Sequence, residues 1–568
     1  MTWKQTAELK KILSKESGSI VHDAGGRLRF ALIYPNSYRV GMSNLGIHII
    51  YGLLNSRPDI SCERFFLPEP KTLAELERTD AQILSLETQT PLNKFSVIGF
   101  AISFEQDYFN VVKILRRGKI KIRASERTNF DPLVIAGGPC ATFNPEPLSE
   151  IFDAFVIGEG EVILPQLFDV LTAMKNFSRR EIVEKISDVP GIYVPSLFEH
   201  VYKPDGTIEK IVAPKKVSRQ YVENLDDFPA HSVIITDETE FNMYLIETAR
   251  GCGRHCRFCM AGYCFRRPRN RSLEVLKSEV DAAKKFGKKI GLMGAAVSDY
   301  PEINALCKYI SDAGLPMSVA SFRADSVTPE LVQTLANSGL KTLTIAPEAG
   351  SEKMRRIINK SITEENIFSA VQLGLDAGIK NFKLYFMIGL PFETLEDVEE
   401  ISGLVLRLKK FHAGGKITLS VNPFIPKPCT PFERASFADK KYLNAALKIL
   451  RSNLKSQPGV EIISESLKSA KVQAILARGD RRLAGLVAES DSPQKFLQLL
   501  KTSGIDENFY LSRERSEEEI FAWDAIDRGF TKKYLSEELK KAEQQKFTPP
   551  CFDDCKRCGV CNQKIFNF

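Results

Sequence analysis

Cysteines gather at two places in this sequence of 568 residues, and thiolates are the usual ligands of iron-sulfur clusters. The first group is Cys252, Cys256 and Cys259. Three thiolates on one short loop can hold three corners of a [4Fe-4S] cube and leave the fourth iron open to a substrate or cosubstrate. The alternative is a zinc loop with His255 as the fourth ligand, which the close spacing makes awkward.

The second group has enough thiolates to saturate one metal centre: Cys551, Cys555, Cys558 and Cys561. A structural zinc site usually combines two separated Cys-x-x-Cys pairs, whereas these cysteines share one continuous segment. Continuous runs are more typical of iron-sulfur ligation, although the ferredoxin run has a different spacing. We therefore predict a metal centre here, with a second cluster favoured over zinc.

Two series of elements must position these cysteines, and the first is an alternation of apolar runs and helical stretches from about residue 28 to 175. This is the pattern of an open parallel α/β sheet. Glycines follow several of the runs, at the strand ends where such sheets bind ligands. We expect a Rossmann-like domain over residues 1–180 and a β-rich linker over residues 181–238.

A second series supplies the strand that leads directly into the first cysteine group. Six strand-like runs over roughly 195 residues predict a partial or full β/α (TIM) barrel over residues 239–435. Active sites of such barrels lie at the carboxyl ends of the strands, where these cysteines stand. The rest of the chain predicts a helical region over residues 436–545 and a cysteine-rich tail over residues 546–568.

Composition excludes several classes of protein. Hydrophobic residues make up 43% and charged residues 26%, which is ordinary for a globular chain. No run approaches the roughly 20 apolar residues of a membrane helix, and the first residues mix Lys with Glu where a signal peptide would be apolar. We expect a cytoplasmic protein with no membrane contact and reduced thiols. The net charge of +7 is too small to demand a polyanionic partner.

The segment from Arg250 to Cys259 resembles the radical S-adenosylmethionine (SAM) superfamily. Its Cys-x-x-x-Cys-x-Φ-Cys spacing, with Phe258 at the aromatic position, follows the first barrel strand as in that family. The resemblance implies a [4Fe-4S] cluster whose free iron chelates SAM. It also implies an enzyme that forms a 5′-deoxyadenosyl radical and begins by abstracting hydrogen, with flavodoxin or ferredoxin as a reductant.

Segments on later strands resemble the SAM-binding positions of the same family. Residues 294–296 stand where the family has a Gly-Gly-Glu turn, from which they depart in sequence. The resemblance implies these SAM-binding residues: Phe258, Gly294, Ala295, Ser321, Arg323, Glu348, Ile388 and Gly389. The alternative for Arg323 and Glu348 is a structural ion pair at the barrel rim.

Residues 136–161 resemble the cobalamin-binding domain that precedes many radical SAM barrels, in which the corrin lies between the two domains. The sequence has no Asp-x-His-x-x-Gly stretch, so the histidine that replaces the lower cobalamin ligand in one large group is missing. Two alternatives follow. Either cobalamin binds without that histidine and supplies a methyl group, or the domain only docks substrate.

The resemblance covers nearly the whole chain, including the tail cysteines, but supplies neither a substrate nor a catalytic residue. Residues 422–428 are similar to a segment of methylthiotransferase-like members, so a modifier of tRNA or protein is the alternative enzyme. The alternative of another class is a non-catalytic iron-sulfur or zinc protein that binds nucleic acid. A run of arginines either attracts an anionic partner or, as we favour, balances the cluster charge. They are Arg250, Arg254, Arg257, Arg266, Arg267, Arg269 and Arg271.

Overall fold

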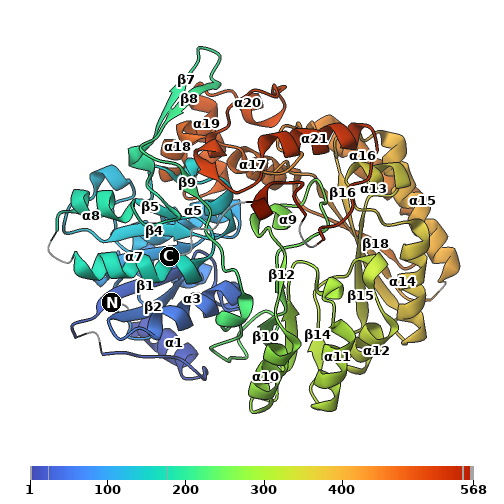
Figure 1. Cartoon of the computed structure of the whole chain (residues 1–568), viewed down its shortest axis with the longest axis horizontal. Helices are drawn as coiled ribbons and strands as arrows, with labels where there is room; N and C mark the ends of the chain where they lie inside the picture. The colour runs from blue at the N-terminus through green and yellow to red at the C-terminus, as the bar shows by residue number, and fades with distance from the viewer. Residues whose placement is uncertain (1–2, 24, 175–176, 413, 553–554, 563–568) are drawn as a thin grey trace.

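The computed structural model describes residues 3–23, 25–174, 177–412, 414–552 and 555–562. Two α/β units lie side by side, and helices from the C-terminal part of the chain lie along both of them (Figure 1). Among the described residues, no helix has the length and apolar character needed to span a bilayer.

The first unit is a sheet of order β2-β1-β3-β4-β5-β6, covered on both faces. Its parallel strands are β1 (Leu28–Tyr34), β2 (Ile60–Phe66), β3 (Val97–Ala101), β4 (Leu133–Gly137) and β5 (Ala154–Val156), and β6 (Ile192–Tyr193) is antiparallel. One apolar core lies under α3 (Leu45–Asn55) and α7 (Gly160–Ala173), and another under α5 (Tyr108–Arg117). Burial on both faces explains why these strands are almost continuously apolar. The expected Rossmann-like sheet is confirmed.

The second unit is a partial barrel made of two parallel sheets. One contains β10 (Met243–Glu247), β13 (Lys289–Met293) and β14 (Met317–Ser318). The other contains β15 (Thr342–Glu348), β16 (Asn381–Ile388), β17 (Ile417–Pro423) and β18 (Val460–Ser464). A bridge between Phe322 and Ile345 joins the two sheets. The six expected strands are present, and β18 is a seventh that the sequence did not predict.

The linker contains a β-hairpin, in agreement with the β-rich character expected for it. Strands β7 (Glu199–Tyr202) and β8 (Ile208–Val212) pair antiparallel, and Gly206 adopts a positive φ of 83° in the turn between them. Further along, β9 (Val217–Ser218) pairs with β19 (Ile526–Asp527), which lies more than 300 residues later. The linker is therefore fixed by the C-terminal part of the chain.

The C-terminal region is largely helical, as expected, and contacts both units. Its helices are α16 (Lys440–Leu454), α17 (Leu467–Ala477), α18 (Ala484–Ala488), α19 (Pro493–Thr502), α20 (Asn508–Leu511) and α21 (Lys532–Glu543). Gln473 in α17 donates to Glu105 in the first unit at 2.8 Å, and Lys427, which follows β17, pairs with the same carboxylate. This region therefore joins the first unit to the barrel.

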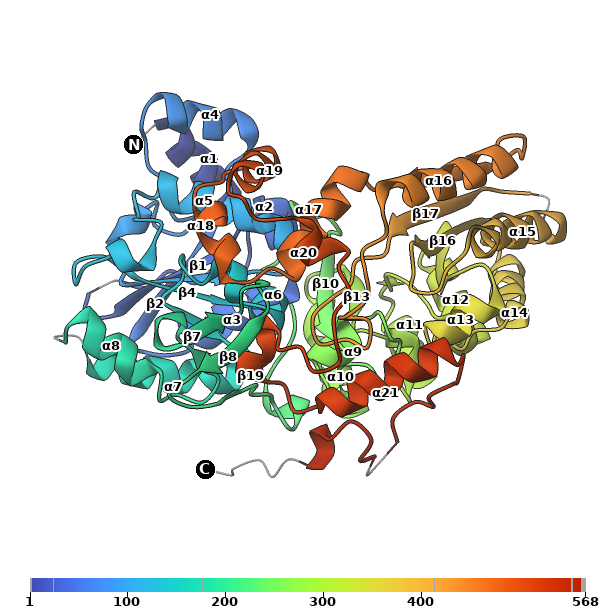
Figure 2. The ribbon, with the colours of Figure 1, turned by 90° about the horizontal axis from the view of Figure 1, so that it is seen from above.

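The described part of the tail packs against the barrel loop that carries the first cysteines. Figure 2 shows α21 and the last segment beside α9 (Ala261–Cys264). One apolar cluster contains Tyr263 and Cys264 from α9, Tyr534 from α21, and Cys558 and Val560 from the tail. Residues 553–554 and 563–568 of the predicted tail lie outside the described residues.

Candidate functional site

The first cysteine group lies in a loop closed at its base by a short ribbon. Strand β11 (Ala249–Arg250) precedes the loop and pairs antiparallel with β12 (Arg269–Asn270) beyond it. Burial, and then the charges of Cys256 and Cys252, raise the pKa of the Cys259 thiol to about 12. Metal binding must therefore displace a proton from Cys259.

The thiols do not stand in a ligating arrangement. Within the described ranges, no three His, Cys, Asp or Glu side chains are grouped so that they could hold a metal ion. Loading of either cysteine group would therefore require thiols to rotate toward a common point.

Arg323 lies directly beside the first group. It is 8% exposed, and its Nη1 is 3.7 Å from Cys256 Sγ. Its Nε donates to Asp325 at 3.0 Å and its Nη2 to the carbonyl of Lys360 at 2.7 Å. Lys360 Nζ in turn lies 3.3 Å from Glu348 Oε1. The alternative of a direct pair between Arg323 and Glu348 is therefore wrong, because each has a different partner.

A cavity of about 490 Å³ lies between the carboxyl ends of the two units. The first unit contributes Ala101, Ser103 and residues 136–139, and the barrel contributes Glu247, Met293, Gly294 and Ala295. Gly251 and Ala261 also line it, so the cavity reaches both ends of the segment that carries Cys252 to Cys259. Strand ends from both units thus converge on the cysteine loop.

The other expected SAM-binding residues do not line this cavity. Phe258 packs beside Leu390 and Phe424, Ser321 is exposed, and Ile388 is fully buried. Gly389 lines a separate cavity of about 710 Å³. Glu348 has a φ of 70°, which is uncommon for a residue with a Cβ and often marks a functional site. Of the eight residues expected to bind SAM, only Gly294 and Ala295 line the 490 Å³ cavity between the two units.

Most of the arginine run pairs with carboxylates. Glu159 lies 2.9 Å from Arg250 and 2.6 Å from Arg269, and Arg250 also pairs with Glu161 at 2.8 Å. Although burial raises it, Arg269 and Arg250 hold the pKa of Glu159 below its usual range.

Three further arginines of the run pair with Asp299, Glu538 and Glu247: Arg254, Arg257 and Arg271. The favoured interpretation, that this run balances the cluster, is therefore wrong for these five. The structure compensates their charges with buried or half-buried acids, most of them far away in the sequence. Sequence reasoning missed the part that Glu159 plays, for which the Gly-Glu-Gly-Glu segment after β5 was the available signal.

The first residue of the second cysteine group, Cys551, contacts the loop that carries the first group. The backbone N–H of Cys551 donates to the carbonyl of Gly253 at 2.8 Å, and His255 Nε2 is 3.1 Å from Cys551 Sγ. Arg557 Nε donates to Cys555 Sγ at 3.1 Å. The imidazole of His255 thus faces the tail, which does not support it as a fourth ligand of its own loop.

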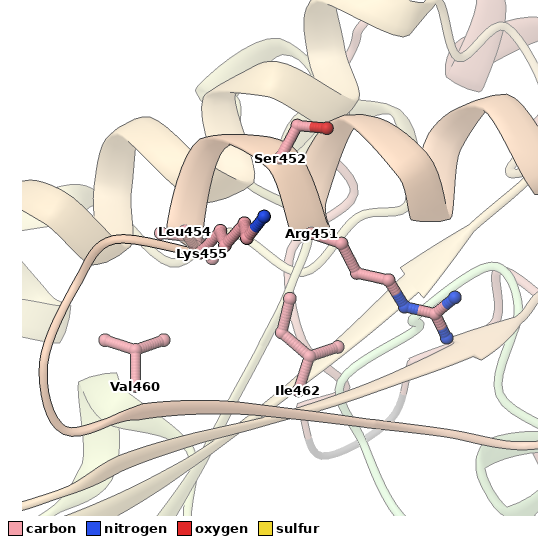
Figure 3. Close-up of a pocket in the computed structure, with 6 residues that line it drawn as sticks. All are labelled: Arg451, Ser452, Leu454, Lys455, Val460 and Ile462. Carbon is pink, nitrogen blue, oxygen red and sulfur yellow. The ribbon is translucent and has the colours of Figure 1, made fainter.

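A depression of about 390 Å³ lies elsewhere, between α16 and β18. Figure 3 shows Val460 and Ile462 projecting from the strand toward the helix, which carries Arg451 and Ser452. It contains none of the residues expected to bind metal or SAM.

A partial parallel barrel with three closely spaced cysteines at its first strand end, preceded by a Rossmann-like sheet, defines the architecture of a radical SAM enzyme. Family models agree: "Radical SAM proteins, N-terminal" matches residues 46–195 and "Radical SAM superfamily" matches residues 246–405. An uncharacterized protein of Methanocaldococcus jannaschii is 33% identical over 477 residues, which cover 83% of this chain and 93% of that protein. The chain belongs to the radical SAM superfamily, as the sequence predicted.

More distant similarities extend over parts of the chain. The ribosomal protein uS12 methylthiotransferase RimO of a Thermoanaerobacter species is 24% identical, over 64% of this chain and 74% of that one. The methyltransferase TsrM from Kitasatospora setae, with tryptophan and a SAM analogue bound, has 15% identity over 69% of this chain and 72% of its own, with a TM-score of 0.45. The radical enzyme OxsB with aqua-cobalamin has 18% identity over 78% and 58%, with a TM-score of 0.46.

Membership has direct chemical consequences. A radical SAM enzyme uses a [4Fe-4S] cluster and SAM, and it needs a reductant and a substrate. The prediction of an enzyme of this class is confirmed, and it is favoured over a non-catalytic nucleic-acid-binding protein.

Proposed function

We propose that Cys252, Cys256 and Cys259 bind the [4Fe-4S] cluster and that the reaction takes place in the adjoining 490 Å³ cavity. The observation that carries this proposal is the convergence of both units on the cysteine loop. Cavities of about 300–1,000 Å³ with mostly apolar walls and a few polar groups are typical of small-molecule sites. Most of the lining residues are apolar or glycine. The polar ones are Asn44, Ser103, Glu159, Glu161, Glu247 and Arg250.

SAM would lie between the cluster and the barrel strands. Gly294 and Ala295 offer backbone groups at the cavity wall, where the family binds the methionine amino group. Arg323 is a buried cation 3.7 Å from Cys256 Sγ, which suits the carboxylate of SAM and the negative cluster alike. The positive φ of Glu348 supports a functional role for that strand end.

We further propose cobalamin as the second cofactor of the cavity, for methyl transfer to an unidentified substrate. The walls are mostly apolar and lie between the two units, which suits the face of a corrin. The described lining residues include no histidine, so cobalt would have no imidazole ligand from this wall. When bound, the cluster with SAM supplies a 5′-deoxyadenosyl radical, and methylcobalamin supplies a methyl group.

The class-defining activity is tested by anaerobic reconstitution with iron and sulfide, reduction, and measurement of 5′-deoxyadenosine formed from SAM. The wild-type protein is expected to form it, and Cys256→Ala to give only the background without enzyme. Cys264→Ala is the matched control, since Cys264 is a buried thiol of α9 outside the motif, and it should retain activity. Activity that survives in Cys256→Ala would contradict the ligand assignment.

Cobalamin binding is tested separately, by equilibration with hydroxocobalamin and absorbance after desalting. We expect the wild type to retain cobalamin and Ala101→Trp to lose it, because Ala101 lines the cavity and an indole there would obstruct it. Ala101→Ser changes the volume little and should retain cobalamin. A wild-type protein that retains none would leave the first unit as a substrate-docking domain.

We also propose a cytoplasmic location. All twelve cysteines are free thiols in the structure, and both cysteine groups require reduced sulfur to bind metal.

A further inference from the structure

The cysteine-rich tail is anchored to the motif loop by buried hydrogen bonds. Asn359 and Thr548 exchange a reciprocal pair, with Asn359 Nδ2 donating to Thr548 O at 3.0 Å and Thr548 N donating to Asn359 Oδ1 at 2.9 Å. Asn359 Nδ2 also donates to the carbonyl of His255 at 3.2 Å. The position from which the tail cysteines start is therefore fixed relative to the loop.

Helix α21 provides a second anchor, which also runs through Thr548. Glu538 is fully buried and pairs with Arg257 at 3.2 Å, and it accepts a hydrogen bond from Thr548 Oγ1 at 2.8 Å. Arg257 stands between Cys256 and Cys259 in the sequence. One buried carboxylate thus joins the motif to the start of the tail.

His255 has a hydrogen-bonding role that its neighbours define. His255 Nδ1 has two partners, the hydroxyl of Tyr534 and Arg266 Nη1 at 3.2 Å, and of these the guanidinium can only donate. Nδ1 is therefore the acceptor, so the neutral ring carries its hydrogen on Nε2. That hydrogen points to Cys551 Sγ, 3.1 Å away. The imidazole thus donates to the first sulfur of the tail.

Arg266 has hydrogen-bond donors without acceptors. The residue is 1% exposed, with its guanidinium stacked 4.6 Å from the ring centre of Tyr263, and its Nε and Nη2 have no partner among the described residues. It also has no carboxylate to balance its charge in that part of the chain. Tyr263, on which Arg266 stacks, belongs to the same apolar cluster as Cys558 of the tail. Buried unpaired donors are costly, and these indicate a missing anionic acceptor.

We propose that Cys551, Cys555, Cys558 and Cys561 bind a second iron-sulfur cluster, with His255 and Arg266 as positioning residues that donate to its sulfurs. A zinc ion with four thiolates would offer Arg266 only the cysteine sulfurs, of which two already accept from His255 and Arg557. An iron-sulfur cluster adds inorganic sulfides, which suit the two unpaired donors. This inference rests on the proposed function only in that the loop of Cys252 to Cys259, which is proposed to bind the first cluster, also carries His255.

The ligand assignment is tested in the full-length chain by iron, sulfide and zinc analysis after anaerobic reconstitution. Two [4Fe-4S] clusters predict about eight iron atoms per chain in the wild type. The triple variant Cys252→Ala, Cys256→Ala, Cys259→Ala should keep roughly half of the iron, and so should the double variant Cys555→Ala, Cys558→Ala. A triple variant that binds zinc or no metal, while the wild type binds about four iron atoms, would overturn the inference.

This design separates the two proposals. A tail cluster that persists in the triple variant supports the inference even if the wild type cleaves no SAM. Conversely, if the wild type cleaves SAM but binds only one cluster, the proposed function stands and the inference of a second cluster in the tail is rejected. Circular dichroism of each variant distinguishes lost ligands from lost folding.

The role of His255 is tested in the triple-variant background, where the tail cluster is the only one present. Hydrogen bonds to cluster sulfurs stabilise the reduced state, so His255→Phe should shift the reduction potential to a more negative value without loss of iron. His255→Gln keeps an N–H donor and should restore part of the shift. An unchanged potential in His255→Phe would show that the imidazole does not donate to the cluster.

Discussion

Glu433 is a fully buried carboxyl group at the contact between the barrel and the C-terminal region. It accepts hydrogen bonds from the backbone of Cys429 at 2.9 Å and from the indole of Trp523 at 3.0 Å. Burial, and then the charge of Asp524, raise its pKa to about 7. The folded protein therefore holds this proton more tightly than the unfolded chain.

This shift predicts a pH-dependent gain from Glu433→Gln. Because the folded pKa is raised, the free energy of unfolding of the wild type falls as the pH rises from about 4.5 to about 7. The variant lacks this loss, so its advantage should be below about 1 kcal/mol at pH 5 and about 3 kcal/mol at pH 8. Urea unfolding at both pH values measures it. The exposed Glu399→Gln is the control, and an equal advantage of Glu433→Gln at both pH values would contradict the assignment.

At the residue scale, the sequence predicts what depends on local spacing. The three cysteines of the motif share one loop, so their spacing alone indicates a common site. The contact of His255 with Cys551 joins residues 296 positions apart, and it depends on how the tail packs. The same applies to Glu159, whose arginine partners lie in the other unit. Spacing along the chain contains no information on such contacts.

At the element scale, the turn between β5 and α7 holds the base of the motif loop, because Glu159 in this turn pairs with Arg250 and Arg269. Glu159→Gln should remove one buried charge and leave Arg250 and Arg269 with less compensation. Breaking a buried pair costs about 3–5 kcal/mol, measured as a lowered unfolding midpoint in urea. Glu184→Gln removes one partner of an exposed pair with Arg180 and should cost less than about 0.5 kcal/mol. Equal losses of stability in Glu159→Gln and Glu184→Gln would argue against this role of Glu159.

The same turn depends on a glycine for a close crossing of the linker. Gly158 has a φ of 123°, and a Cβ there would lie 2.0 Å from the carbonyl oxygen of Gln220. Gly158→Ala should therefore lower stability by roughly 3 kcal/mol or more. Gly378 also has a positive φ, of 84°, but open space around it, so Gly378→Ala should cost about 1–2 kcal/mol. The midpoints of thermal unfolding compare the two variants. A smaller loss of stability in Gly158→Ala than in Gly378→Ala would show that close contact with Gln220 does not determine the need for glycine at position 158.

The strands were predictable where burial makes them continuously apolar. The strands of the first unit and the six expected barrel strands have this character or a clear alternation. Strand β18 is half-exposed at the edge of its sheet and lies in a charged, helix-rich stretch, so its pattern is weak. Its pairing with β17 is supplied by the sheet rather than by its own sequence.

At the scale of the whole molecule, the C-terminal region holds the two units together. Arg528 is buried and donates to the carbonyl of Thr142 at 3.1 Å in the first unit and to that of Ile526 in β19 at 2.9 Å. Strand β19 pairs with β9 of the linker, immediately after the exposed Lys215 and Lys216. Arg528 thus fixes the linker indirectly.

Arg528→Met should therefore loosen β19 and speed trypsin cleavage after Lys215 or Lys216. Limited proteolysis followed by mass spectrometry of the fragments measures the rate at that site. Arg407→Met removes an exposed arginine of the barrel that pairs with Glu364, and it should leave the rate unchanged. A rate in Arg528→Met equal to the wild-type rate would show that β9 is held without β19.

The contact between the tail and the motif loop can form only late in the synthesis of the chain. Cys551 is made 296 residues after His255, which at about 5–20 residues per second corresponds to roughly 15–60 s of translation. Throughout that interval the nascent chain carries its cysteine loop without the segment that will cover it. Assembly of the loop thus waits until Cys551 has been made, and a chain terminated before that residue would lack the cover.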